Sequence, residues 1–291
     1  MKLLITGASG QLGLAFQEEL RQRGIDFVGA TSSELDIIKP LIVNQMVDLI
    51  KPNVIINAAA WTDVDGAESN EAAAYSVNSL GPQNLAIAAK KAGARLVQIS
   101  TDYVFSGDAS SPWSEKAPHN PQSVYGATKS AGENLVLTTL PSNSYVVRTA
   151  WLYSSAGKNF AKTMANLALN QKGEVRVVND QIGQPTFAGD LAKQIVELVL
   201  SESPAGIYHG TNNGQATWFE FAQAVFSIAG ADVSRVIPVS NTEYPSPAKR
   251  PAYSVLGHDA WTGTSVPAMR NWKIALEEAM PAIISAVKAE G

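Results

Sequence analysis

A glycine-rich turn near the N-terminus constrains the fold of this chain more than any other stretch. Lys2–Thr6 is a mostly apolar run that predicts a short buried strand, and a helical pattern follows through Arg23. Gly7, Gly10 and Gly13 stand between the two, in a G-x-x-G-x-x-G spacing that differs from the commoner G-x-G-x-x-G. Glycine permits a tight turn and lets backbone N–H groups at a helix N-terminus approach a phosphate. The stretch therefore predicts a dinucleotide-binding βαβ unit.

Strands and helices alternate through the first half of the chain. Apolar, β-branched runs predict four further strands, near residues 27–30, 54–57, 95–100 and 145–149. Helical patterns between them include Pro40–Lys51 and Glu68–Ala92, the second interrupted at Gly81-Pro82. Alternation at this interval indicates right-handed βαβ units and a parallel sheet. We expect an α/β fold of the Rossmann type, with a doubly wound parallel sheet.

The regular alternation weakens from Gly157 onward. The segments with a helical pattern are 159–170, 188–200, 218–229 and 272–288, and short strands are expected at 175–178 and 206–209. We expect residues 1–156 to form the dinucleotide-binding Rossmann domain. Residues 157–291 are expected to form mostly a smaller C-terminal substrate-binding lobe, with some segments returning to the Rossmann domain. Such a lobe would cap the carboxyl edge of the sheet, where open α/β folds bind ligands.

Two polar stretches predict one active site. The polar run from Ser100 to Tyr103 ends an apolar strand pattern, while Tyr125 and Lys129 are four residues apart in a segment of helix formers and share one helix face. A lysine ammonium near a phenol lowers the phenol's pKa from about 10, which suits general acid–base catalysis. The Thr101 hydroxyl would hold the reacting oxygen if the strand end faces that helix. The Tyr–Lys spacing alone is also typical of a solvated helix face.

Three further positions bear on ligand binding. Residues 30–33 (Ala-Thr-Ser-Ser) follow the second expected strand and include neither an acid nor an arginine. Hydroxyls without a carboxylate tolerate a 2′-phosphate, which favours NADPH over NADH. Ala58–Ala60 after the third strand either admits a flat ligand or packs a helix on the sheet. Asn78, inside a helical pattern, is either a satisfied core amide or part of the site.

Composition narrows the classes of function. The formal net charge of −4 provides no basic footprint for nucleic acid, and a chain without cysteine has no disulfide, thiolate nucleophile or thiolate metal site. The three histidines have no metal-ligand spacing. No apolar run approaches the ~18 residues of a membrane helix, and the N-terminus does not read as a signal peptide. We expect a cytoplasmic protein with no metal, membrane or nucleic-acid partner.

With these segments in place, the sequence resembles the extended short-chain dehydrogenase/reductase family over nearly its whole length. The motifs that carry the resemblance are Thr6–Gly13, Asn57–Ala60, Ser100–Phe105 and Tyr125–Lys129. A narrower resemblance, to the dTDP-sugar reductases of that family, rests on Ala60–Glu68, Arg148–Tyr153 and Asn179–Thr186. The resemblance implies an NAD(P)H-dependent oxidoreductase of dTDP-rhamnose biosynthesis. Its reaction would reduce the C4 keto group of dTDP-4-dehydro-L-rhamnose to give dTDP-L-rhamnose.

The resemblance also implies roles for matching positions. Tyr125 would protonate the sugar C4 oxygen, Lys129 would lower the pKa of Tyr125 and bind the nicotinamide ribose, and Thr101 would hydrogen-bond the reacting oxygen. Asp102 would lie beside the substrate, and Trp151 is either a surface for the deoxysugar or an ordinary core tryptophan. The expected dinucleotide contacts are Gly7, Gly10, Gln11, Leu12, Gly13, Asp36, Ile37, Ala58, Ala59, Ala60, Tyr125 and Lys129. The expected substrate contacts are Thr101, Asp102, Tyr125, Trp151 and Arg250.

One further candidate contact, two differences from related proteins and two alternative functions complete the prediction. Arg250 lies in a Pro-rich loop, and its guanidinium matches the geometry of the dTDP pyrophosphate.

Some family members bind magnesium between subunits through an acid early in the first helix, where this chain has Ala15, so we expect a monomer or a homodimer without that metal. Sugar-nucleotide dehydratases carry glutamate where Tyr103 stands, which disfavours dehydration. Another sugar-nucleotide 4-ketoreductase or epimerase, or a non-catalytic regulatory subunit of the same fold, remains as an alternative.

Overall fold

A parallel sheet of six strands forms the centre of the computed structural model, which describes residues 1–201 and 203–290. The strands are β1 (Lys2–Thr6), β2 (Asp26–Ala30), β3 (Val54–Asn57), β4 (Arg95–Thr101), β5 (Ser144–Thr149) and β10 (Gly206–His209). Their order is β10-β5-β4-β3-β1-β2, and every pairing is parallel. The order reverses between β1 and β3, which confirms the predicted doubly wound arrangement.

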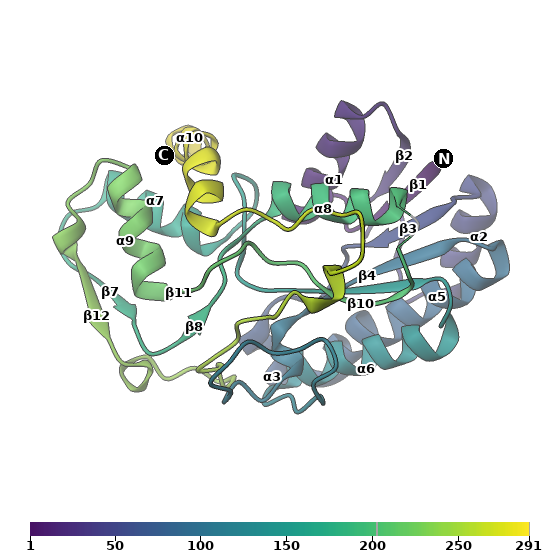
Figure 1. Cartoon of the computed structure of the whole chain (residues 1–291), viewed down its shortest axis with the longest axis horizontal. Coiled ribbons are helices and arrows are strands. Elements are labelled where there is room, and N and C mark those ends of the chain that lie inside the picture. Colours follow the sequence, from purple (N-terminus) through teal and green to yellow (C-terminus); the bar gives the residue numbers. More distant parts are fainter. Residues whose placement is uncertain (202, 291) are drawn as a thin grey trace.

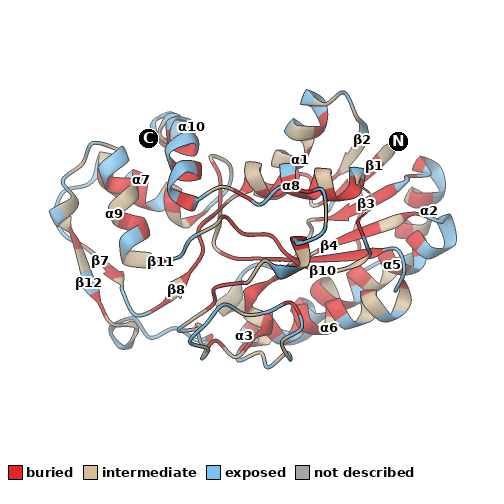
Figure 2. Ribbon diagram, in the orientation of Figure 1, coloured by how far each residue is buried: buried red, intermediate tan, exposed pale blue. Residues whose placement is uncertain are grey.

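Helices cover both faces of this sheet (Figure 1). On one face α1 (Gln11–Gln22) packs on α8 (Ala188–Leu200); on the other α2 (Pro40–Ile50), α5 (Gly81–Ala92) and α6 (Val124–Thr139) pack in sequence. Alternate residues of β1 serve the two cores: Leu3 and Ile5 pack with α1 and α8, whereas Leu4 packs with α2 and α5. Figure 2 shows the central strands buried, which explains why they read as continuous apolar runs.

The helical stretch predicted at Glu68–Ala92 is divided differently from the prediction. It consists of α3 (Val64–Ser69), α4 (Glu71–Tyr75), a π-helical turn (Ser76–Leu80) and α5. Gly81-Pro82 does not interrupt a helix but begins α5, because proline is tolerated in a first turn where its missing N–H has no partner to lose. The break falls earlier, at Asn70.

Most of the C-terminal part has its own apolar core. That core is built from α7 (Phe160–Asn170), α9 (Trp218–Ile228) and α10 (Trp272–Glu290). The short strand pairs beside it are β7 (Val175–Val178) with β12 (Val236–Val239), β8 (Ile182–Gly183) with β11 (Ala216–Thr217), and β6 (Leu152–Tyr153) with β9 (Thr186–Phe187). Of the later elements, α8 and β10 pack with the central sheet. On this packing we propose the division expected above, at residues 156 and 157.

Short 3-10 turns complete the elements, at Asp102–Val104, Val233–Arg235, Asn241–Glu243 and Asp259–Trp261. None of the helices within the described ranges is long and apolar enough to cross a membrane.

Candidate active site

The glycine turn forms a cradle that only residues without a Cβ fit. Gly7 has φ +65°, and a Cβ there would lie 2.7 Å from the backbone of Ala58 and Ala59. A Cβ on Gly13 would lie 2.3 Å from the Gly7 carbonyl oxygen. The turn after β1 therefore touches the segment after β3, at the point where the strand order reverses. Open α/β sheets bind dinucleotides in this crevice.

The N-terminus of α1 points its backbone donors into that cradle without a side-chain cap. Gly10 is the N-cap residue, and within residues 1–201 and 203–290 no side chain caps the first helical N–H groups. The Gln11 carboxamide is turned toward the C-terminal part, where its Oε1 accepts hydrogen bonds from Ser154 Oγ at 3.3 Å and Asn159 Nδ2 at 3.0 Å. Leu12 is buried in the core, so it offers only its backbone to a ligand.

The residues expected near the adenine lie after β2. Asp36 carries a half-exposed carboxylate 3.3 Å from the Lys39 ammonium. The Ile37 side chain is buried against Gly81, so any contact of Ile37 with a ligand is made by its backbone. Sequence reasoning missed an acid at this edge: Glu34 Oε2 accepts hydrogen bonds from the Thr31 N–H and hydroxyl, both at 2.8 Å. The sequence signal for it was the three-residue spacing from Thr31 to Glu34, which is typical of a capping box.

The predicted catalytic residues come together where β4 ends beside the first turns of α6. Ser123 caps α6 by accepting from the Gly126 N–H at 3.1 Å, which directs Tyr125 and Lys129 toward the strand end. Lys129 Nζ donates to the Ile99 carbonyl oxygen at 2.6 Å. The Thr101 side chain lies near enough to the Tyr125 hydroxyl to lower its pKa. The strand end therefore does face the helix, as the predicted site requires.

Burial sets the protonation of this cluster. It raises the pKa of Tyr125 well above the ordinary value, and the contact with Thr101 only partly opposes the shift. Burial also lowers the pKa of Lys129 to about 8, against the nearby Glu133 carboxylate, which raises it. The net rise in the pKa of Tyr125 comes from burial, and the lowering of that pKa expected from Lys129 stays a prediction. A phenol that stays protonated is suited to donating a proton.

Asp102 is a buried carboxyl beside the same cluster. Its Oδ1 accepts from Thr101 Oγ1 at 2.9 Å, and the Ser254 side chain lies near enough to the carboxyl to lower its pKa. The buried Oδ2 has no hydrogen bond of good geometry within residues 1–201 and 203–290. Burial raises the pKa of Asp102 to about 6. An oxygen left without a partner in a buried site is costly unless a ligand supplies one.

Asn78, left open by the sequence, is a satisfied core amide. Its Oδ1 accepts from the Trp61 N–H at 2.9 Å, and its Nδ2 donates to the Trp61 carbonyl and the Thr128 hydroxyl, each at 3.1 Å. It ties the loop after β3 to α6. The small residues after β3 serve a close backbone approach, since the Gly7 turn lies directly against Ala58.

Trp151 lies in an unusual backbone conformation beside a partner that sequence reasoning missed. Its φ is +46°, a strained value for a bulky residue, and its ring stacks on Trp218 with centroids 3.5 Å apart. Gly183 makes room for the indole, because a Cβ there would lie 2.4 Å from Trp151 Cε2. No local pattern pairs residues so distant in sequence.

Arg250 lines a cavity of about 680 Å³ that also touches Trp218, Tyr244 and Lys249. Its guanidinium is already engaged: Nη2 donates to Asp65 Oδ2 at 2.6 Å and Nη1 to the Tyr103 hydroxyl at 3.2 Å. The Tyr103 ring meets the Tyr125 ring edge-on at 5.5 Å. The structure thus brings Arg250 to the border of the catalytic cluster.

A buried ion pair lies next to the cluster, near Ser100 and Lys129. Glu133 and Arg148 are fully buried, and Arg148 Nη2 donates to Glu133 Oε2 at 2.7 Å. Arg148 Nη2 also lies 2.6 Å from His119 Nε2, and Ser100 Oγ bonds Glu133 Oε1. Sequence reasoning missed this network, because charges on a helix and on a strand show no spacing that would pair them.

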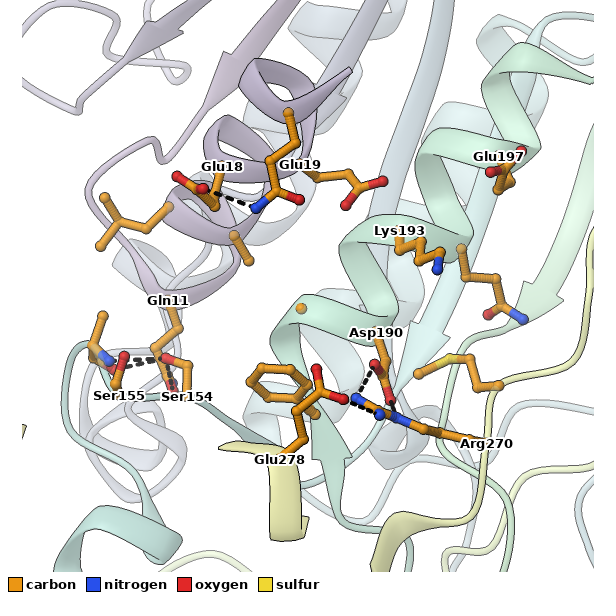
Figure 3. A pocket seen from close by; sticks show the side chains of 18 of the residues that line it. Gln11, Glu18, Glu19, Ser154, Ser155, Asp190, Lys193, Glu197, Arg270 and Glu278 are labelled. Carbon is orange, nitrogen blue, oxygen red and sulfur yellow. Dashed lines mark hydrogen bonds and ion pairs between the residues drawn. The ribbon is translucent and has the colours of Figure 1, made fainter. Parts of the chain in front are cut away.

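A second cavity, of about 940 Å³, lies between α1 and α8 (Figure 3). It includes Gln11 at its edge and Ala15, but Thr101, Tyr125 and Lys129 do not line it. Two of the acids that line it pair with Arg270: Arg270 Nη2 lies 2.8 Å from Asp190 Oδ1, and Arg270 Nη1 pairs with Glu278. In the described part of the chain, no three His, Asp or Glu side chains group so that they could hold a metal ion.

The Thr–Tyr–Lys cluster and the glycine cradle lie at the same carboxyl edge of a Rossmann-type parallel sheet, which defines the class of nucleotide-dependent short-chain reductases. The chain belongs to the family described as RmlD substrate binding domain, whose sequence model matches residues 1–284.

Relatives in this family cover nearly the whole chain. A protein of Streptomyces griseus named dTDP-4-dehydrorhamnose reductase is 44% identical over 284 residues, 96% of this chain and 93% of that protein. A Streptomyces antibioticus protein, named a probable dTDP-4,6-dihydroxy-2-methyloxan-3-one 4-ketoreductase, is 44% identical over 98% of this chain and 97% of its own length. The solved dTDP-4-dehydrorhamnose reductase of Bacillus anthracis, in complex with NADP, is 41% identical with a TM-score of 0.92, covering 96% of this chain and 98% of that one.

Proposed function

We propose that this protein is an NADP(H)-dependent reductase that converts the C4 keto group of dTDP-4-dehydro-L-rhamnose to the alcohol of dTDP-L-rhamnose. The observation that carries the proposal is the meeting of Thr101, Tyr125 and Lys129 at the end of β4, on the sheet edge that also carries the glycine cradle. Relatives of matching length named as dTDP-sugar reductases support it. The complete set also argues against a regulatory subunit, which would not need all three groups.

The residues present fit a dinucleotide. Gly7 and Gly13 let the turn after β1 pack closely on the segment after β3, and the start of α1, which has no side-chain cap among the described residues, offers N–H donors to a pyrophosphate. Ala58–Ala60 would adjoin the nucleotide, and Asp36 with the Ile37 backbone would meet the adenine. Lys129 would bind the nicotinamide ribose. When bound, the reduced nicotinamide supplies a hydride to the sugar C4.

The protein's own part in the chemistry is to hold the keto oxygen and supply a proton. Tyr125 gives its phenolic proton to the C4 oxygen as the C4–H bond forms, so the carbonyl becomes an alcohol and the phenol becomes a phenolate. Thr101 hydrogen-bonds the same oxygen, and the Lys129 ammonium offsets the charge left behind. The raised pKa of Tyr125 keeps its proton in place until then.

Two polar groups and one ring would position the substrate. Asp102 Oδ2, which has no hydrogen bond of good geometry among the described residues, would accept one from a sugar hydroxyl. Trp151, stacked on Trp218, would place its indole against the deoxysugar. Arg250 would pair with the pyrophosphate through the N–H groups that Asp65 and Tyr103 leave free.

The preference for NADPH over NADH is part of the proposal. The hydroxyl groups of Thr31–Ser33 support it, and the NADP bound to the Bacillus anthracis relative agrees with it. The Glu34 carboxylate on Thr31 opposes it, because two anions repel. Titration of the protein and its Glu34→Gln variant with each cofactor decides the matter: a clear NADH preference in both overturns the NADPH preference.

The deciding experiment follows NADPH and NADH oxidation with dTDP-4-dehydro-L-rhamnose, comparing the natural protein with Tyr125→Phe. We expect turnover in the former and its loss in the variant, with dinucleotide affinity unchanged. A second candidate, reduction of another dTDP-linked 4-keto sugar, is favoured by the 44% identity to a Streptomyces niveus protein named dTDP-4-keto-6-deoxy-D-glucose reductase. Faster turnover of dTDP-4-keto-6-deoxy-D-glucose would select it. Tight dinucleotide binding without turnover of either sugar would instead indicate a regulatory protein.

We further propose a cytoplasmic monomer or homodimer that needs no metal. The Ala15 side chain offers no ligating atom. Asp190, an acid that lines the same cavity as Ala15, already accepts hydrogen bonds from Arg270 Nε and Nη2, both at 2.8 Å. Activity that a chelator abolishes and magnesium restores would contradict this.

A further inference from the structure

The Tyr103 hydroxyl has a hydrogen to give and, among the described residues, no acceptor that takes it. An arginine carries only donors, so in the 3.2 Å contact between Arg250 Nη1 and the Tyr103 hydroxyl the phenol oxygen must accept. Its own hydrogen is left for another partner. Burial raises the pKa of Tyr103, so the phenol stays neutral and remains a donor.

The place of this hydroxyl is fixed from three sides. The Tyr103 N–H donates to Thr101 Oγ1 at 3.2 Å, and the ring lies edge-on to Tyr125. The start of α6 packs tightly on the residue, because a Cβ on Gly126 would lie 2.3 Å from the Tyr103 carbonyl oxygen. The Tyr103 hydroxyl therefore meets Arg250, whose guanidinium belongs to a residue lining the 680 Å³ cavity, while the Tyr103 ring meets the ring of Tyr125.

Asp65 holds the arginine that orients this hydroxyl. One carboxylate oxygen pairs with Arg250 Nη2 at 2.6 Å, and the other accepts from the Ala248 N–H at 3.2 Å. A single side chain from α3 thus anchors both the backbone and the cation of a segment 185 residues further along the chain. The three residues form one chain of contacts, Asp65 to Arg250 to Tyr103.

We propose that the Tyr103 hydroxyl donates a hydrogen bond to a diphosphate oxygen of the nucleotide sugar, and that Asp65 is a positioning residue that acts through Arg250. An anionic oxygen is the expected acceptor for the Tyr103 hydroxyl, because the neighbouring Arg250 guanidinium attracts a negative charge. This guanidinium also has further N–H groups that can donate to the same anion. The inference rests on the proposed function, since it takes a nucleoside diphosphate as the group bound. It assigns substrate positioning to a phenol at the position where dehydratases carry an acid.

The test measures dTDP binding by titration calorimetry, so it does not depend on turnover. The variants are Tyr103→Phe, which keeps the ring, Asp65→Asn, which keeps the shape, and the double variant. We expect each single change to weaken dTDP binding about tenfold, as for loss of one hydrogen bond to a charged group. The double variant should be no weaker than about the weaker single one, since both changes remove the same contact. Tyr75→Phe, an exposed tyrosine on α4, is the matched control and should bind normally.

A kinetic measurement separates positioning from a merely structural role. In Tyr103→Phe the KM for the dTDP-sugar should rise about tenfold while kcat stays within about twofold, because the diphosphate contact is equal in ground and transition states. NADPH affinity should not change. Normal dTDP binding by Tyr103→Phe overturns the inference, and strictly additive losses overturn the role of Asp65. A natural protein that binds NADPH but no dTDP would overturn the proposed function itself, and this inference with it.

Discussion

The Lys129 ammonium donates a hydrogen bond of 2.6 Å to the Ile99 carbonyl oxygen and so joins α6 to the end of β4. The bond spans two elements that the sequence separates by a long polar loop. It fixes the lysine next to the strand end that carries Thr101, and this ammonium makes no other hydrogen bond within residues 1–201 and 203–290. The catalytic geometry is therefore a property of the contact between helix and strand.

Activity should fall as the pH rises through about 8. Burial lowers the pKa of Lys129 to about 8, so the ammonium is present below that pH and is lost above it. The measurement is the pH profile of kcat/KM between pH 6 and 10 for the natural protein and for Lys129→Met. We expect the alkaline decline in the former alone. A decline of the same midpoint in the residual activity of the variant would show that another group titrates.

Asp102→Asn should become relatively more stable as the pH rises from 4 to 7. Between about pH 4 and pH 6 the unfolded chain has released the Asp102 proton while the folded protein keeps it, so folding stability falls with rising pH. The raised pKa corresponds to about 3 kcal/mol, which the neutral amide does not lose. Urea unfolding at several pH values checks this. Asp26→Asn, at an exposed carboxylate, is the control and should show no such trend.

Glu133→Gln should cost about 3–5 kcal/mol of unfolding free energy, because it leaves the fully buried Arg148 without a charged partner. The control is Asp48→Asn, which breaks an exposed pair 3.0 Å from Lys91 and should cost under about 1 kcal/mol. Denaturant titration of the three proteins gives both values. Equal losses would mean that the buried pair is no more important than the exposed one.

Gly183→Ala should displace the Trp151 indole. The added methyl group would lie 2.4 Å from Cε2, and overpacking of this kind costs about 1–3 kcal/mol. If the indole faces the deoxysugar, the KM for the sugar nucleotide should also rise several-fold, while NADPH affinity stays constant. Thermal unfolding and steady-state kinetics measure the two effects. A destabilised variant with an unchanged KM would assign Trp151 to the core instead.

Much of the framework could be predicted from local patterns. The strands β1, β3 and β4 are buried on both faces, so their apolar runs are visible without any knowledge of their neighbours. The glycine turn was equally visible from its G-x-x-G-x-x-G spacing. The structure shows the reason for that spacing, because a side chain at Gly7 or Gly13 would collide with backbone. The predicted break at Gly81-Pro82 failed because a first helical turn tolerates proline.

The amino-acid sequence by itself determined the parallel α/β sheet and the glycine turn, since both follow from short-range patterns, and it predicted Thr101, Tyr125 and Lys129 as candidates. Only the tertiary structure decided that Arg250 meets Asp65 and Tyr103, that Trp218 stacks on Trp151, and that the pKa of Tyr125 rises. Contacts between residues far apart in the chain have no local signature. Desolvation depends on everything packed around a group, so the direction of such a shift emerges only from the folded protein.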